Sequence, residues 1–253
     1  MDGTARKNYI IKMMKDSNSV KILELSKKLK VTRETIRHDL YDLEKEKLVK
    51  VVRGGAILNT PITETPYDKR LDAHISEKSD IADKFVEYIE KGDTIYLDYG
   101  TTSLFVARKI KNMNNINVVT NSLPIINELY KSKSVRLIVL GGEVRSNEGS
   151  LYGREAINNL KYLNINIGFF SGSGFSPEFG LSNIHIGESE LARVVAEHSQ
   201  SIIVGIDHYK FGNVFINKVL PVSKIDTLIT DSLTDQELIG RLSEETNLVF
   251  AQE

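Results

Sequence analysis

The sequence contains no cysteine, and this absence excludes several kinds of chemistry. Disulfides, thiol catalysis and cysteine metal sites all need that residue. Only five histidines occur, and no two of them have the i, i+4 spacing of a helical metal site. His185 with Glu188 and Glu190 could ligate a metal in principle, but such a stretch is more typical of a solvated helix start. We therefore expect no metal ion and no cofactor.

Long hydrophobic runs are also missing. No stretch approaches the roughly 18–20 apolar residues that span a bilayer, and the N-terminal segment lacks the apolar core of a signal peptide. The chain has 253 residues, of which 41% are hydrophobic and 26% charged, and this is an ordinary globular composition. We expect a cytoplasmic protein without a membrane partner, built as one large domain or two unequal ones.

The net charge of −1 hides an uneven distribution. Residues 1–60 contain 14 Lys and Arg against 8 Asp and Glu, a net charge of +6, whereas the rest of the chain holds 19 and 26, a net charge of −7. A basic head on an acidic body favours contact between the head and a polyanion. Chance clustering on a solvated surface is the alternative.

The first 47 residues have the apolar spacing of three helices, and two short strands follow around Gly54 and Gly55. In the third helix Ile36, Leu40 and Leu43 form one apolar stripe, and Thr32 stands where an N-cap belongs. A helix, a short turn and a capped helix followed by a hairpin predict a winged helix-turn-helix domain.

The face of the third helix opposite the stripe carries long hydrogen-bond donors and short hydroxyls. Side chains of these types reach base edges in the major groove and the flanking phosphates. The residues that we expect to contact DNA are Thr32, Arg33, Thr35, Arg37, His38, Tyr41 and, in the wing, Arg53. A three-helix interaction module with a solvated charged face is the alternative.

The pattern divides the chain into residues 1–58, a Pro-containing linker at residues 59–72, and residues 73–253. In the third part, near-continuous apolar strands alternate with helices. This alternation predicts an α/β domain with a mostly parallel sheet that is covered on both faces.

Polar residues collect where these predicted strands end. Ligands of open parallel sheets bind at the carboxyl ends of strands, so five polar strand ends together predict a site for a polyol phosphate or a similar anion. The residues that we expect to bind it are Asp98, Gly100, Thr101, Thr102, Ser103, Asn121, Ser122, Gly141, Gly142 and Lys210. Gly100, Thr101 and Thr102 would hold the phosphate at a helix start, Asp98 the hydroxyls, and Lys210 would supply a cation.

The stretch "KILELSKKLKVTRETIRHDLYDLEKEKLVKVVRGGA" resembles the N-terminal domain of the DeoR-type bacterial transcription regulators. The family's motif runs from an ELA-like second helix through a Thr-Ile-Arg-Arg-Asp-Leu recognition helix to a Gly-Gly-Ala wing. This chain departs from the motif at His38, where the second Arg is usual, and at Arg53, so the operator sequence does not carry over.

The resemblance continues through "GDTIYLDYGTTS", "VVTNS", "LGGEVR", "YGREA" and "KFG" and covers nearly the whole chain. It implies a C-terminal sensor related in fold to ribose-5-phosphate isomerases and coenzyme-A transferases. In that family the sensor binds a phosphorylated sugar or a related metabolite, and binding usually releases the operator. Tyr209 and Ser171 depart from the family pattern and leave the identity of the effector open.

These observations predict a sequence-specific regulator of transcription. We expect it to be a repressor of a sugar or carbohydrate operon. Its partners would be double-stranded operator DNA, a phosphorylated sugar and further copies of the chain, as a dimer or a tetramer. We expect no enzymatic activity and no catalytic residues. The competing class is a sugar-phosphate isomerase with a basic head, in which Asp98 and Lys210 would be acid–base partners.

Overall fold

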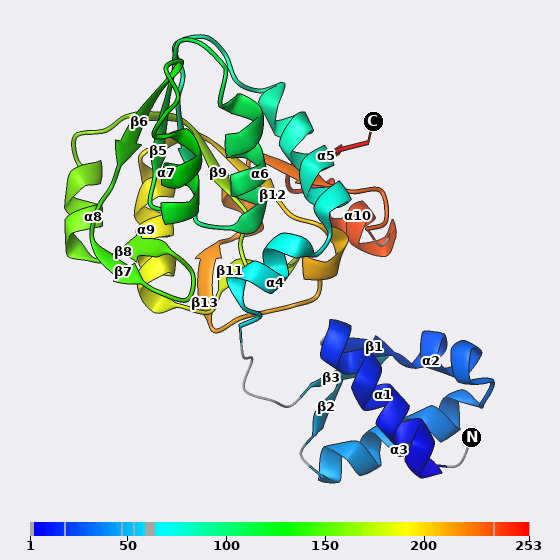
Figure 1. Cartoon of the computed structure of the whole chain (residues 1–253). Coiled ribbons are helices and arrows are strands. Elements are labelled where there is room, and N and C mark those ends of the chain that lie inside the picture. Colours follow the sequence, from blue (N-terminus) through cyan, green and yellow to red (C-terminus); the bar gives the residue numbers. More distant parts are fainter. Residues whose placement is uncertain are drawn as a thin grey trace. The chain divides into compact units, whose positions relative to one another are not determined.

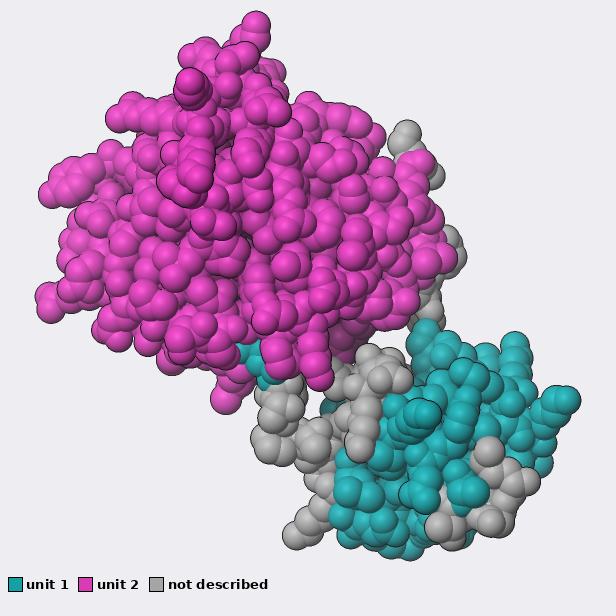
Figure 2. Space-filling model, viewed as in Figure 1, with its two compact units in different colours: residues 1–64 teal, residues 65–253 magenta. Residues whose placement is uncertain are grey.

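The computed structural model describes residues 3–17, 19–46, 48–52, 54–58, 64–234 and 236–252. The chain divides into two compact units, Met1–Glu64 and Thr65–Glu253 (Figure 2). The second unit begins earlier than the sequence indicated, because residues 67–72 of the expected linker form helix α4. Pro66 occupies the N-cap position of this helix, and Tyr67 is buried. Residues 59–63 of the expected linker lie outside the described part.

Over its described residues, the first unit contains three helices and a small antiparallel sheet (Figure 1). Its elements are α1 (Gly3–Ser17), β1 (Ser19–Lys21), α2 (Ile22–Leu29), α3 (Arg33–Lys45), β2 (Val49–Val52) and β3 (Gly55–Leu58). Ile10, Leu25, Ile36 and Leu40 are almost fully buried in one core, because each lies on the apolar stripe of its helix.

The wing is the hairpin of β2 and β3, as the glycines predict, and β1 adds a third strand beside β3. Strand β1 was not evident from the sequence because three residues are too few to show a period. Only glycine fits at residue 55, since a Cβ there would lie 2.0 Å from the carbonyl oxygen of Val20. The winged helix-turn-helix prediction is confirmed.

A seven-stranded sheet forms the centre of the second unit, and every neighbouring pair in it is parallel. The strand order is β15-β14-β12-β9-β4-β5-β6. These strands are β4 (Thr94–Leu97), β5 (Ile116–Thr120), β6 (Val135–Val139), β9 (Ile165–Phe170), β12 (Ser199–Gly205), β14 (Thr227–Thr230) and β15 (Asn247–Phe250).

Helices cover both faces of this sheet (Figure 1). They are α4 (Tyr67–Asp72), α5 (Ile75–Val86), α6 (Thr101–Ile110), α7 (Leu123–Leu129), α8 (Arg154–Leu160), α9 (Ile186–Glu197) and α10 (Gln236–Leu242). Successive strand residues point to opposite faces: Phe169 packs in the core of α5, α6 and α7, and Phe170 in the core of α8 and α9. The mostly parallel α/β fold is therefore confirmed.

Two antiparallel additions and two short 3-10 turns complete the unit. They are the hairpin β7 (Glu143–Arg145) with β8 (Ser150–Tyr152), the small sheet β10 (Gly174–Ser176), β11 (Gly180–Asn183) and β13 (Asn217–Leu220), and the turns η1 (His208–Lys210) and η2 (Val222–Lys224). Both additions follow carboxyl ends of sheet strands, and the sequence pattern did not indicate them as strands.

The strand order reverses between β4 and β9. From β4 the chain continues outward to β5 and β6, whereas from β9 it continues in the other direction to β12, β14 and β15. Open parallel sheets bind their ligands outside the carboxyl ends of the strands at such a reversal. A ligand of this fold is therefore expected to bind at the segments that follow β4 and β9.

Candidate functional site

The predicted recognition helix α3 begins as its sequence suggests. The side chain of Thr32 accepts a hydrogen bond from the backbone N–H of Thr35 at 3.1 Å. Arg37 is half exposed and forms an ion pair with Glu34 at 2.9 Å. Among the other predicted DNA-contact residues, Thr32, Arg33, His38 and Tyr41 are exposed and Thr35 is partly buried. Arg53 lies outside the described residues.

Asp98 follows β4 and connects it to the end of β9. Its carboxylate accepts hydrogen bonds from the N–H groups of Gly100 at 3.0 Å and Ser171 at 2.7 Å, and from the hydroxyls of Ser103 and Ser171. The group is almost fully buried, so these donors compensate for its lost hydration. Because its acceptor sites are occupied by protein, its contact with ligand hydroxyls stays a prediction.

The N-terminus of α6 lies directly beside this carboxylate. Gly100 is its N-cap and offers no side-chain cap, so the first amides of the helix keep their positive ends available to an anion. Thr101, Thr102 and Ser103 are buried, and within the described residues the Thr102 hydroxyl has no hydrogen-bond partner. A Cβ on Gly100 would lie 1.8 Å from Ser171 Oγ, so glycine is required for this close packing.

The remaining predicted residues of this edge hold the loops in place. The Asn121 side chain accepts from the Tyr96 hydroxyl and donates to the Leu151 carbonyl, each at 2.8 Å, and Ser122 caps α7. Gly141 and Gly142 both have positive φ values and start the β7–β8 hairpin, where a Cβ on Gly142 would meet the Tyr152 carbonyl at 2.3 Å.

Lys210 approaches the end of β9 from the loop after β12. Its Nζ donates to the carbonyl of Gly172 at 2.5 Å. Burial lowers the pKa of Lys210, and the carboxylate of Asp207 opposes this shift. Its Nζ also lies 3.5 Å from the carbonyl oxygen of Ser171, so the lysine stands at the end of β9 beside Asp98, and its contact with a ligand stays a prediction.

Two further cations, Lys78 of α5 and Arg70 of α4, belong to this cluster, and the sequence did not single them out. Lys78 is almost fully buried and donates to the carbonyls of Ala73, at 2.5 Å, and Arg70. Burial, and after it the nearby charge of Lys210, lower the pKa of Lys78 to about 8, and the carboxylate of Asp207 opposes this shift. The Arg70 guanidinium forms an ion pair with the buried carboxylate of Glu148.

Tyr67 adds a second hydroxyl without a partner. Its OH is buried and bonds to none of the described residues, its ring lies against the Arg70 guanidinium at 5.6 Å, and burial raises its pKa to about 12. A buried hydroxyl without a partner is costly unless a ligand or water satisfies it. Three cations, two such hydroxyls and an open helix N-terminus suit an anion that also carries hydroxyls.

Tyr209, which departs from the family pattern, lies between two imidazole rings. Its ring stacks on His74 with centroids 3.7 Å apart and contacts His208 at 3.9 Å. The His208 Nδ1 in turn lies 2.8 Å from the Asp231 carboxylate. This stack connects the loop that carries Lys210 to the corner between α4 and α5.

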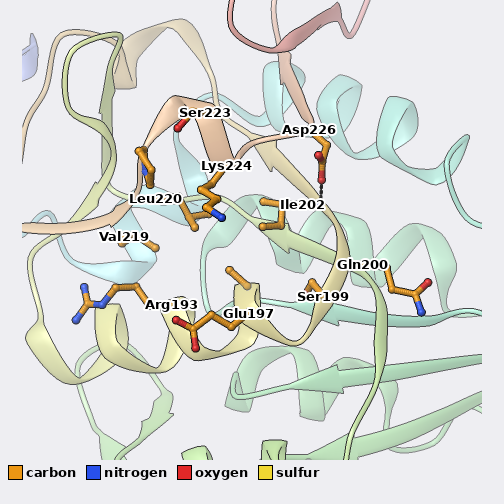
Figure 3. A pocket seen from close by; sticks show the side chains of 12 residues that line it. Arg193, Glu197, Ser199, Gln200, Ile202, Val219, Leu220, Ser223, Lys224 and Asp226 are labelled. Atoms are coloured by element: carbon orange, nitrogen blue, oxygen red, sulfur yellow. Dashed lines mark hydrogen bonds between the residues drawn. The ribbon is translucent and has the colours of Figure 1, made fainter.

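A separate pocket of about 610 Å³ opens at the opposite ends of the strands, beside the amino ends of β12 and β14 (Figure 3). Its charged side chains are of both signs: Arg193 and Lys224 stand with Glu197 and Asp226. Asp226 also accepts from the backbone N–H of Ile202 at 2.7 Å. None of the ligand-binding residues predicted from the sequence lines this pocket.

Within the described ranges, no cluster of His, Asp and Glu is suited to hold a metal ion. No described helix combines the length and the apolar character needed to cross a membrane.

Comparison with known proteins identifies the family of the chain. The DeoR-like helix-turn-helix domain matches residues 6–62, and the DeoR C-terminal sensor domain matches residues 73–232. The glycerol-3-phosphate regulon repressor of Escherichia coli is 32% identical over 232 residues, which are 92% of each chain. The HTH-type transcriptional regulator GolR of Listeria innocua is 31% identical over 240 residues, 94% of each chain.

Among solved structures, a D-ribose-5-phosphate isomerase in complex with phospho-erythronic acid matches 53% of this chain and 52% of its own, with a TM-score of 0.40 and 14% identity. The family domains cover most of the chain, and the relatives align over nearly their full length. The chain therefore belongs to the DeoR family of DNA-binding transcription regulators.

Proposed function

We propose that the protein represses a sugar or carbohydrate operon in the cytoplasm and releases its double-stranded operator when a phosphorylated sugar binds the second unit. The observation that carries this proposal is the group of three cations, Arg70, Lys78 and Lys210, at the carboxyl edge of the sheet. The name of the Escherichia coli relative, a glycerol-3-phosphate regulon repressor, supports the class of ligand.

The phosphate would lie at the N-terminus of α6 and face these cations. The amides of Thr101 and Thr102 would donate to it at the positive end of the helix dipole, and the buried Thr102 hydroxyl, which has no partner among the described residues, would gain one. Lys78 and Lys210 gain most from an anion, because burial makes their charged forms costly and a phosphate offsets that cost. The Tyr67 hydroxyl would bind a sugar oxygen.

The first unit would bind DNA through α3. Symmetric regulators read two half-sites about one helical turn apart, roughly 10 bp, so we propose that the protein acts as a homo-oligomer whose second units form the core. A ligand changes DNA affinity only through its different affinities for the two states of the protein. The proposed effector therefore binds the released state more tightly than the DNA-bound state.

The isomerase alternative needs a base that can reach a substrate proton. The carboxylates in the cluster are engaged otherwise: Asp98 accepts from four protein donors, and Glu148 pairs with Arg70. The relatives named above are transcription regulators, and this also supports a protein without turnover. Sustained conversion of any pentose or hexose phosphate in an assay of the purified chain would overturn the regulator-only proposal.

A thermal-shift screen tests the ligand class. Phosphorylated sugars and polyol phosphates should raise the melting temperature, since a ligand that binds the native state stabilises it, and the same sugars without phosphate should leave it unchanged. Equal shifts from both sets would contradict an anion site.

The affinity for such an anion should fall as the pH rises above about 8. Lys78 loses its proton in the free protein at a pKa of about 8, whereas a bound phosphate favours the charged ammonium. Binding therefore takes up a proton above that pH, and affinity should fall by up to about tenfold per pH unit. The phosphate dianion does not titrate there, because its second pKa is about 6.

Isothermal titration of the best ligand between pH 7 and pH 9.5 measures this dependence. Lys78→Met removes the titrating group and should give a weaker but flatter profile. A wild-type profile as flat as that of the variant would show that Lys78 does not face the ligand.

A further inference from the structure

Helix α3 carries one acidic residue on its buried face. Asp39 lies among Ile36, Leu40 and Leu43, which form the apolar stripe of the helix, and it is only 6% exposed. A carboxylate in such a place is costly unless a cation pairs with it. Its partner therefore decides how this helix can sit against the rest of the unit.

The partner is Arg6 of α1. Arg6 Nε lies 2.5 Å from one carboxylate oxygen of Asp39 and Nη2 lies 2.9 Å from the other. Both side chains are largely shielded from solvent, with exposures of 13% and 8%. The two parallel contacts form a planar fork, the geometry that gives an arginine–carboxylate pair its directional specificity.

The Arg6–Asp39 fork adds a directional contact, which the apolar contacts of α3 do not provide. Burial of Ile36 and Leu40 turns the apolar stripe of α3 to the core. Because apolar burial itself is non-directional, it sets this rotation less sharply than a polar contact does. A two-point contact between α1 and the middle of α3 restricts both the rotation and the sliding of α3. The outer face of the same helix carries Arg37 and His38, whose reach to base edges depends on that rotation.

Further observations connect the pair to the DNA-facing side. A pocket of about 370 Å³ brings Arg6 and Asp39 together with Thr32, Thr35 and His38 of the predicted contact surface. The pair and these residues at the start of the recognition helix therefore line one pocket, and we expect a change in the pair to shift the groups beside it.

We propose that Arg6 and Asp39 are positioning residues for DNA recognition: their fork sets the orientation of α3 and so its sequence specificity. The proposal rests on the proposed DNA binding through α3. A basic residue of this unit can act on DNA binding in two ways. Its charge strengthens binding to DNA of any sequence, whereas a role in orienting α3 strengthens binding only to the matching sequence.

The test compares two duplexes for each variant of the full chain. One is the duplex that the wild type enriches from a random-sequence library, and the other is an unselected duplex of the same length and composition. The specificity ratio is the affinity for the first divided by that for the second. Arg6→Gln should lower this ratio about tenfold, the discrimination that one lost base contact accounts for.

Lys7→Gln is the matched control, because it removes the same charge one residue further along α1. Lys7 Nζ lies 3.6 Å from the Asp42 carboxylate, and both partners are more exposed than the Arg6–Asp39 pair. This control should weaken binding to both duplexes by a similar factor and leave the ratio unchanged.

Arg6→Lys is a second variant that keeps the test valid if the Arg6→Gln protein does not fold. It keeps the charge but loses the fork, so it should melt near the wild-type temperature and still lower the ratio. A wild-type preference that both Arg6 variants retain would overturn the positioning role. A wild type that enriches no duplex at all would contradict the proposed DNA recognition, and the positioning role with it.

Discussion

Replacing Lys210 with methionine should abolish the response to a phosphorylated sugar and leave DNA binding intact. The lysine supplies a charge to the proposed anion site, and hydrogen bonds to charged groups contribute about 1.5–3 kcal/mol each. Ligand affinity should therefore fall roughly 10- to 150-fold. Methionine fills a similar volume without charge, so the effect reports the lost cation rather than a cavity.

Two measurements isolate this effect. Isothermal titration gives the affinity for the best ligand of the thermal-shift screen, and anisotropy with the enriched duplex shows whether DNA is still bound and whether the ligand releases it. Lys224→Met is the control, since Lys224 is an exposed lysine at the opposite edge of the same sheet (Figure 3). Release of DNA from Lys210→Met at the wild-type ligand concentration would show that the site is misplaced.

Arg37→Ala should weaken binding to the enriched duplex with little effect on the second unit. The guanidinium is half exposed on the outer face of α3, and loss of an arginine that reads a base costs about 1–3 kcal/mol and relaxes specificity at that position. Its ion pair with Glu34 is an exposed pair that contributes little to stability, about 0–1 kcal/mol, so the melting temperature should change little.

Arg241→Ala is a matched control for this variant. Arg241 is about as exposed as Arg37, and it forms a similar surface ion pair, with Glu178 at 2.7 Å, but in the second unit. It should bind DNA as the wild type does. An Arg37→Ala protein with unchanged affinity for the enriched duplex would exclude Arg37 from the recognition surface.

The regular elements could be predicted because their residues repeat along the chain. The Ile36, Leu40 and Leu43 stripe indicated α3, and the near-continuous apolar strands indicated a covered parallel sheet, since parallel strands are buried on both faces. Elements of three residues, such as β1 and β7, have no period to detect, so they become evident only from their pairing with β3 and β8.

The candidate site was predicted in part. Polar residues after β4 and β9 are visible in the sequence because they follow apolar strands, and parallel strands bring such residues together at their carboxyl ends. Lys210 stands out in the same way in the loop after β12. Arg70 and Lys78 do not, because they stand in the charged segment "YDKRLDAHISEK", most of which is exposed or partly exposed, and only the fold shows that Lys78 is buried. Asp98 is visible in the sequence, but two of its four protein donors belong to Ser171 at the end of β9, which lies 73 residues away in the chain.

The central claim is that anion occupancy of the second unit controls DNA binding by the first. The most direct measurement is a fluorescence anisotropy titration of the wild-type complex with its enriched duplex, using a phosphorylated sugar and the same sugar without phosphate. We predict that the phosphorylated compound releases the duplex and that the free sugar does not. If a phosphorylated sugar that raises the melting temperature leaves the anisotropy unchanged, the claim is contradicted.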